Sequence, residues 1–271
     1  MKIMTFNLRT DFPLDIKNRW NKRKEIVYEV IKNNDFDIIG VQELNNKMFN
    51  DLTSNISNYN FVGMPRSKKF FSERNDILVS TKHRILNYNT FWLSEKPNEI
   101  GSNVWYSVFP RICTTALIEL DDGNIIRVYN THLDFLFSKA REYGLKKIGE
   151  YMESQHAKDD YPAMLMGDFN ASPSSKAIRE FTEGKYSSKK FIAVQENKKD
   201  LYSMSTLSKF KGKKKGLHID YIFVTEEFNV RNSEIMYYNK EGKYPSDHYP
   251  ISAELEIIRW VMNTLLNVRF Y

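Results

Sequence analysis

The sequence is poor in cysteine and in long apolar runs. Cys113 is the only cysteine among 271 residues, so no disulfide bond can form within the chain. No run approaches the roughly 18 apolar residues of a membrane-spanning helix. The N-terminal stretch MKIMTFNLRT alternates apolar and polar residues from its third position, which leaves no room for the apolar core of a signal peptide. We therefore expect a cytoplasmic protein with no membrane partner, unless an export signal precedes this sequence.

Several motifs and segment types are also missing. There is no GxxxxGK phosphate loop and no GxSxG, which argues against a nucleotide-driven motor and a serine hydrolase. There is no internal repeat, no linker rich in Gly, Pro or Ser, and no break in composition. With 41% hydrophobic and 27% charged residues, the chain has the composition of an ordinary globular protein. We expect a single catalytic domain over residues 1–271.

Positive charge is concentrated in one stretch. The net charge is +6, yet residues 183–217 contain ten lysines against three acidic residues, so the rest of the chain is close to neutral. This stretch is either a solvated flexible loop or a surface that contacts substrate phosphate. The candidates for phosphate contact are Lys211, Lys213, Lys214 and Lys215.

The apolar pattern indicates alternating strands and helices. Short β-branched or aromatic runs, typical of buried strands, are IMTFN, FDIIGVQE, NDILVST, IIRVYNTHLD, YPAMLMGDFN and HIDYIFVT. Helical spacing of apolar residues occurs in 16–34 and 140–156, and Ser172 followed by Pro173 predicts the start of a short helix. DDGN, at 121–124, predicts a hairpin turn. The pattern favours an α/β fold with helices packed outside large mixed sheets.

Polar side chains recur where these apolar runs end. Asp168 and Asn170 are two residues apart, so on a strand they would share one face. Similar polar interruptions are Asn7, Glu43, His132, Asp220, Asp247 and His248. Each could singly be a satisfied structural group, but an unpaired buried charge is costly, and one common site explains all of them more economically.

The residue types select a chemistry. Carboxylates and amides without a cysteine cluster suit Mg²⁺, with Mn²⁺ as a possible substitute, better than zinc. A histidine beside a carboxylate supplies a positioned base or a cation for a phosphate oxygen. These groups predict hydrolysis at phosphorus, in which a metal stabilises charge on the phosphate and a water oriented by Asp168 attacks.

The ordered motifs TFNLR, GVQE, THLD, GDFNASP, HIDYIFV and SDHYP resemble those of the endonuclease/exonuclease/phosphatase superfamily, which includes deoxyribonuclease I. The resemblance runs from Asn7 to His248. It implies a four-layer α/β sandwich, two stacked mixed β-sheets flanked by helices, with the site at one edge.

The resemblance also assigns roles to the motif residues. Glu43 would be the principal metal ligand, with Asn7 beside it and Asp247 nearby. Asp168 would orient or deprotonate water and Asn170 would hold a phosphate oxygen. His248 would contact the scissile phosphate while Asp220 holds it in place. Whether Asp168 or His248 is the base stays open.

Two further segments refine the resemblance. THLD, with His132, is closer to deoxyribonuclease I than to exonuclease III, and SERNDIL resembles the stretch whose glutamate supports that histidine. This predicts that Glu73 pairs with His132. FWLSEKP and FPRICT resemble a bacterial branch whose substrates are mostly unassigned, in which Arg111 could reach substrate phosphate.

The leading functional expectation is a Mg²⁺-dependent phosphodiesterase that cleaves nucleic acid. The alternative enzyme hydrolyses a small phosphorylated metabolite, such as a sugar, inositol or nucleotide-cofactor phosphate. A catalytically dead binding module is a remote third reading, because every expected site position is filled. No obligate protein partner is evident, and the apolar residues of the tail, among them Trp260 and Phe270, are expected to pack on the domain.

Overall fold

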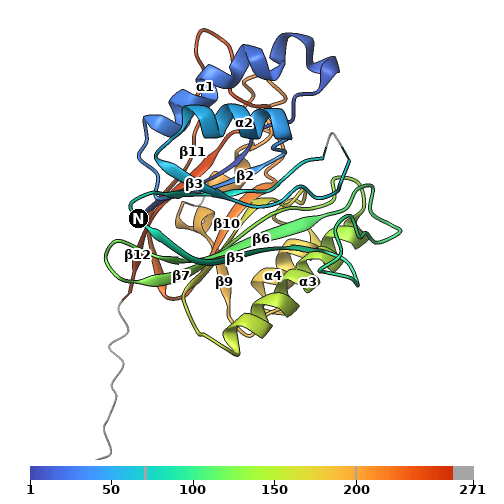
Figure 1. Cartoon of the computed structure of the whole chain (residues 1–271), viewed down its shortest axis with the longest axis vertical. Helices are drawn as coiled ribbons and strands as arrows, with labels where there is room; N and C mark the ends of the chain where they lie inside the picture. The colour runs from blue at the N-terminus through green and yellow to red at the C-terminus, as the bar shows by residue number, and fades with distance from the viewer. Residues whose placement is uncertain (70–71, 199, 259–271) are drawn as a thin grey trace, which may run out of the picture.

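The computed structural model describes residues 1–69, 72–198 and 200–258. Their strands form two six-stranded sheets that stack face to face, with helices on the outer face of each sheet (Figure 1). The predicted four-layer α/β sandwich is confirmed. The tail residues Trp260 and Phe270 lie outside the described ranges. Across these ranges, no helix combines the length and the apolar character that crossing a membrane requires.

The first sheet has the strand order β11-β12-β1-β2-β4-β3. Its strands are β1 (Lys2–Asn7), β2 (Ile38–Gln42), β3 (Tyr59–Val62), β4 (Ile77–Ser80), β11 (Phe228–Ile235) and β12 (Ile251–Ile257). The central pair, β1 and β2, is parallel, and the other pairings are antiparallel. Both central strands are almost continuously apolar and buried, as expected for strands covered on both faces.

The second sheet has the order β5-β6-β7-β8-β10-β9. Its strands are β5 (Arg84–Trp92), β6 (Ile112–Glu119), β7 (Ile125–His132), β8 (Ala163–Asp168), β9 (Phe191–Ala193) and β10 (Asp220–Thr225). Only β7 and β8 pair in parallel. The turn predicted from DDGN joins β6 to β7, which pair as an antiparallel hairpin.

The helices form the two outer layers. α1 (Trp20–Lys32) and α2 (Asn46–Asn55) cover the first sheet, and α3 (Ser138–His156) and α4 (Lys176–Thr182) cover the second (Figure 1). Short 3-10 turns are η1 (Pro13–Asn18), η2 (Val194–Asn197) and η3 (Leu201–Ser203). The predicted cap of α4 was wrong: Ser175 accepts a hydrogen bond from Ile178 N, because the Ser172–Pro173 pair lies in the loop before the helix.

Three apolar cores follow from these layers. One fills the space between the sheets, with residues such as Ile38, Val128 and Ile222, and the other two lie between each sheet and its helices. Asn130 is a buried polar exception between the sheets: its Nδ2 donates to the carbonyl oxygens of Val41 (2.9 Å) and Asp76 (2.8 Å) on the opposite sheet. This bridge fixes how the strand ends of the two sheets face each other near the predicted site.

Candidate active site

Three predicted residues lie side by side on the second sheet. Asp168 ends β8, and the strand register places it opposite His132, which ends β7, and Asp220, which begins β10. Gly167, the preceding residue, has a φ of 147°, and a Cβ there would meet the carbonyl oxygen of Thr131 at 1.9 Å. The glycine of GDFN is therefore required by the close approach of β7.

The first sheet contributes residues from the corresponding edge. Asn7 ends β1, and Glu43 follows β2 directly. The Asn7 amide joins the two sheets, because its Nδ2 donates to Glu43 Oε1 (3.1 Å) and to Asp168 Oδ2 (2.9 Å). Ser246, in the segment before β12, donates from Oγ to the Asn7 carbonyl oxygen at 2.6 Å. That contact holds His248 near the same edge.

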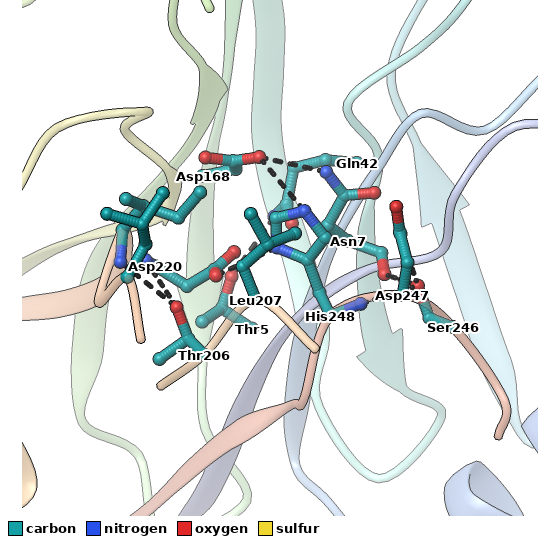
Figure 2. A network of polar contacts seen from close by, with 12 residues as sticks. Thr5, Asn7, Gln42, Asp168, Thr206, Leu207, Asp220, Ser246, Asp247 and His248 are labelled. Atoms are coloured by element: carbon teal, nitrogen blue, oxygen red, sulfur yellow. Dashed lines mark hydrogen bonds and ion pairs between the residues drawn. The ribbon is translucent and has the colours of Figure 1, made fainter. Parts of the chain in front are cut away.

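Two histidines converge on one carboxylate oxygen. His248 pairs through Nδ1 with Asp220 Oδ2 at 2.9 Å, and its Nε2 lies 3.8 Å from Asp168 Oδ2. His132 Nε2 lies 3.6 Å from the same Asp168 oxygen. In Figure 2, Asn7 and His248 occupy the middle of the network, with Asp220 on one side and Asp247 on the other. The predicted His248–Asp220 contact is thus present, and both Nε2 atoms lie just beyond hydrogen-bonding distance of Asp168.

Burial and charge give the two histidines opposite character. Burial lowers the pKa of His132 well below its usual value, and the nearby Arg111 and Arg66 act in the same direction. For His248, burial opposes the charged form, but the carboxylates of Asp220 and Asp168 raise its pKa well above the usual value. Burial and the charge of Asp220 raise the pKa of Asp168 to about 7. The site therefore holds a neutral His132 and a protonated His248 beside one shared carboxylate.

The oxygen ligands for a divalent cation lie beside this group. Glu43 keeps a lowered pKa despite burial, because Thr10 N donates to Oε2 at 2.9 Å and Arg9 carries positive charge nearby. Burial raises the pKa of Asp247, and the negative charge of Glu43 adds to that rise. Glu43 and Asp247 are both half-buried, and an ionised Glu43 disfavours ionisation of Asp247, so a hard cation that neutralises both carboxylates fits this place.

A second set of ligand-type atoms comes from the group around His248. One atom each of Asp168, Asp220 and His248 lies within 4.8 Å of the others. In this set, however, His248 Nδ1 and Asp220 Oδ2 are already paired with each other at 2.9 Å. Glu43 and Asp247, with Asn7 beside them, are therefore the better residues to hold a cation.

Most of these groups line one cavity of about 460 Å³, whereas Asn7 and Asp220 are outside its lining. Its lining includes Glu43, His132, Asp168, Asn170, Asp247 and His248. Arg111 also lines it; this side chain is 6% exposed, and its Nε has no hydrogen-bond partner among the described residues. Three phenylalanines, Phe12, Phe109 and Phe135, stand at the mouth, each between 42% and 53% exposed.

The predicted lysines lie outside this cavity. Lys211, Lys213, Lys214 and Lys215 are exposed, and none of them lines it. The stretch that carries them does contact the site segment, as expected: Ser208 N and Lys209 N donate to the Asp247 carbonyl oxygen at 2.7 and 2.9 Å. The stretch thus contacts the site segment, while these four lysines lie outside the cavity.

Left-handed backbone conformations gather at the site. The φ values of Arg9, Glu43 and Asn170 are 52°, 61° and 48°. Residues other than glycine seldom adopt this left-handed backbone region. This corrects the reason given for the spacing of Asp168 and Asn170. β8 ends at Asp168, and Asn170 reaches the cavity through its turned backbone, with its N–H donating to Asp168 Oδ1 at 2.8 Å.

The predicted pairing of Glu73 with His132 was wrong. Glu73 instead pairs with Arg66, Oε2 to Nη1 at 2.8 Å, and no hydrogen bond joins it to His132 in the described part of the chain. The physical reason is that an arginine stays charged, whereas buried His132 is held neutral and offers the carboxylate little attraction. Glu73 still lines the cavity.

Sequence reasoning missed part of the lining. Arg9, Arg66 and the three phenylalanines at the mouth were not predicted, although all of them line the cavity. A weak signal existed, because Phe109 stands in FPRIC and Phe135 follows THLD, both within motifs used for the prediction. Arg9 Nε pairs with Asp15 (2.8 Å) and lies 3.9 Å from Asp247 Oδ2.

The stacked sheets and the carboxylate–histidine edge define an enzyme class: phosphoric ester hydrolases with the deoxyribonuclease I-like fold. A model of the endonuclease/exonuclease/phosphatase family matches residues 4–248, and the chain belongs to this family, whose members depend on divalent metals. Among proteins with curated descriptions, none matches the chain.

Several solved structures are similar over nearly the whole chain. A mannosyl-6-phosphatase from Bacteroides thetaiotaomicron is 26% identical, with a TM-score of 0.85, and the alignment covers 95% of this chain and 100% of that one. A family protein from Bacteroides vulgatus is 30% identical, with a TM-score of 0.82 and coverage of 94% and 98%. The catalytic domain of human nocturnin, at 17% identity and a TM-score of 0.74 with coverage of 95% and 94%, shares the fold.

Proposed function

We propose that the protein is a Mg²⁺-dependent phosphatase or phosphodiesterase of a small phosphorylated metabolite. The observation that carries this proposal is the placement of the catalytic groups inside a cavity of about 460 Å³ with phenylalanines at its mouth. A cavity of this size accommodates a compact substrate. The similarity to a protein named mannosyl-6-phosphatase also supports a small phosphorylated substrate. We therefore prefer the metabolite to the nucleic acid that the charge pattern favoured.

Proton transfer is assigned to Asp168 and His248. Asp168 accepts the proton of the attacking water, because its carboxylate faces the cavity and is fixed by Asn7 Nδ2 and the Asn170 N–H. His248, held through Nδ1 by Asp220, keeps its Nε2–H on the same side. As water adds to phosphorus and the ester bond breaks, His248 gives a proton to the oxygen that leaves.

The remaining groups bind the phosphate. Arg111 lines the cavity, and its Nε makes no hydrogen bond among the described residues but lies 3.9 Å from Asp134 Oδ2. Burial lowers the pKa of Arg111 only to about 10, so it stays cationic at neutral pH. Neutral His132 and the Asn170 amide line the same wall and complete the set of polar groups around the phosphate oxygens. Mg²⁺, or Mn²⁺ in its place, would be held by Glu43 and Asp247 with Asn7 beside them, and supplies charge stabilisation on the phosphate when bound.

Nucleic acid remains a second candidate because of one observation. The lysine-rich stretch packs directly against the Asp247 segment through Ser208 and Lys209, and its four predicted lysines are exposed. Such an arrangement could hold the backbone of a strand whose end enters the cavity.

A substrate panel with matched controls tests the proposal. We would measure phosphate release from hexose, inositol and nucleotide phosphates, and strand cleavage of DNA and RNA, with Mg²⁺, with Mn²⁺ and with EDTA. Asp168→Asn, prepared in the same way, reports contaminating hydrolases. We expect metal-dependent release from small esters that the variant lacks. Robust strand cleavage without release from any small ester would contradict the proposal in favour of the second candidate.

A further inference from the structure

A second hollow of about 660 Å³ opens beside the catalytic cavity. We call it the side chamber; it lies between the loop before η1 and the start of α2, and its lining includes Phe12, Pro13, Asn45, Asn46 and Phe109. Phe12 and Phe109, together with the Arg66–Glu73 pair, line both hollows. The two hollows therefore adjoin, and a substrate with its phosphate at Asp168 would reach the side chamber by passing these shared residues.

Acidic groups offset most of the positive charge that lines the side chamber, where two acids stand against three cations. Arg19 Nε and Lys47 Nζ both pair with Asp11, at 2.5 and 3.1 Å, and Arg66 pairs with Glu73. Among the described residues of the lining, no cation is left without an acidic partner. A polynucleotide would place the phosphate next to the scissile one in the side chamber, and free cations there would strengthen its binding. The side chamber instead suits an uncharged group.

The remaining lining combines ring faces with hydrogen-bonding groups. Phe12 and Phe109 offer apolar surface, while the Asn46 side chain is exposed and makes no hydrogen bond within the described structure. A hydrocarbon chain would cover these polar groups without satisfying them, which costs free energy. A sugar ring has apolar C–H faces and a belt of hydroxyl groups, so it matches both parts of the lining.

The walls of the side chamber are held in place by hydrogen bonds, most of them between separate loops. Asn45 caps α2 through Oδ1, which accepts from Met48 N at 3.0 Å, and its Nδ2 donates to Thr10 Oγ1 at 3.2 Å. On the other wall, Asp134 Oδ2 accepts from Ser107 Oγ (2.9 Å) and Val108 N (3.0 Å), directly before Phe109. A fixed wall loses little conformational entropy when a ligand binds.

We propose that the side chamber binds the neutral, hydroxyl-bearing ring of the substrate, the chemistry of a hexose, while the phosphate of the same molecule lies in the catalytic cavity. Phe12, Phe109 and Asn46 then determine which phosphate esters the enzyme prefers. This inference rests on the proposed function. It adds to it the part of the substrate that does not react and the place where that part binds.

The test compares two substrates and two matched variants. Asn46→Trp places a bulky ring in the side chamber, and Asn50→Trp makes the same change at an exposed position of α2 that lies outside its lining. For Asn46→Trp we expect kcat/KM for a hexose 6-phosphate to fall by about tenfold or more, the scale on which altered pocket contacts discriminate substrates. Ethyl phosphate, which cannot reach the side chamber, should be hydrolysed as before, and Asn50→Trp should change neither rate.

A second pair guards against an effect of the tryptophan itself. Asn46→Ala, which removes the amide without adding a ring, should lower the hexose phosphate rate selectively, and Asn50→Ala, outside the lining, should not. Unchanged melting temperatures would show that all four variants are folded.

Several results would overturn the inference. One is an equal loss of kcat/KM on both substrates in Asn46→Trp, and another is an unchanged rate with the hexose phosphate. A third is a selective loss of kcat/KM with a nucleoside monophosphate or a long-chain alkyl phosphate instead of the hexose phosphate. Failure of the proposed function looks different, because the unmodified enzyme would then release phosphate from no small ester. An enzyme that hydrolyses ethyl phosphate without preferring hexose phosphates keeps the proposed function and removes only this inference.

Discussion

Two buried histidines each pair with an aspartate at nearly the same distance, but they lie at opposite ends of the sandwich. His248 Nδ1 is 2.9 Å from Asp220, and His83 Nε2 is 3.0 Å from Asp37. The difference is the second ring nitrogen. In His83 it accepts the backbone N–H of Asp121 at 3.2 Å, whereas in His248 it faces Asp168 across 3.8 Å, a distance too long for a direct hydrogen bond.

The presence of a hollow does not distinguish the His248–Asp220 pair from the His83–Asp37 pair either. His83 and Asp37 line a depression of about 390 Å³, much as His248 lines the catalytic cavity. A histidine–aspartate pair beside a hollow is therefore not sufficient to identify a catalytic site. What distinguishes His248 is a nitrogen left available, a second carboxylate in front of it, and neighbours such as Glu43 with strained backbone.

The largest expected effect comes from His248→Gln. This change keeps a polar side chain but removes the proton donor, so kcat should fall by roughly 10²- to 10⁴-fold, the usual contribution of general acid–base catalysis. Steady-state kinetics on the best substrate of the panel would measure it, with the melting temperature as the folding control. If His248→Gln keeps more than half of the activity, the assignment of His248 is wrong.

The same substitution at His83 should act on stability instead. His83→Gln disturbs a buried hydrogen-bond pair, and we expect a loss of roughly 1–3 kcal/mol in the free energy of unfolding, with kcat and KM unchanged. Denaturant unfolding and kinetics on one preparation separate the two outcomes. A large drop in kcat without a change in stability would mean that His83 takes part in the reaction, and the contrast with His248 would fail.

The smallest effect concerns His156, a histidine whose two ring nitrogens are buried without a hydrogen-bond partner. Burial and the charge of Lys189 lower its pKa, although Asp160 and Glu153 oppose this. Because the unfolded chain binds a proton near pH 6.5 and the folded protein does not, this site should cost stability as the pH falls below about 6.5, with a slope of at most about 1.4 kcal/mol per pH unit.

The measurement for His156 is the difference between the unmodified protein and His156→Gln in unfolding experiments from pH 8 to pH 5. The two curves should run parallel above pH 7 and converge or cross below it, since the variant lacks the titrating group. Parallel curves over the whole range would show that His156 does not titrate differently in the folded protein.

Much of the site was predictable because its residues end apolar strands. Asn7, Glu43, His132, Asp168 and Asp220 each follow or interrupt a buried run, and the structure brings all of them to one edge. Strand pairing explains this success, since parallel neighbours end together. Asn170 was predicted from its two-residue spacing to Asp168 on a strand, and this reason was insufficient. Its side chain reaches the cavity because Asn170 has a left-handed backbone conformation, which strand periodicity does not describe.

Other features depended on how the loops fold. Glu73 could pair with His132 or with an arginine, and only the folded chain places Arg66 close enough to take it. The same holds for the side chamber, whose walls come from separate loops that hydrogen bonds of Asn45 and Asp134 keep in position. Loop positions of this kind depend on packing over long sequence separations, which local patterns do not encode.

The sequence by itself determined the α/β sandwich, the family and the set of polar residues at the strand ends, because strand periodicity and ordered motifs are local properties of the chain. The tertiary structure alone decided which histidine keeps a nitrogen available, which cation Glu73 pairs with, and where the lysines stand relative to the cavity. These outcomes depend on distances of a few ångströms that only the folded chain sets, and burial then sets the charge that each group carries.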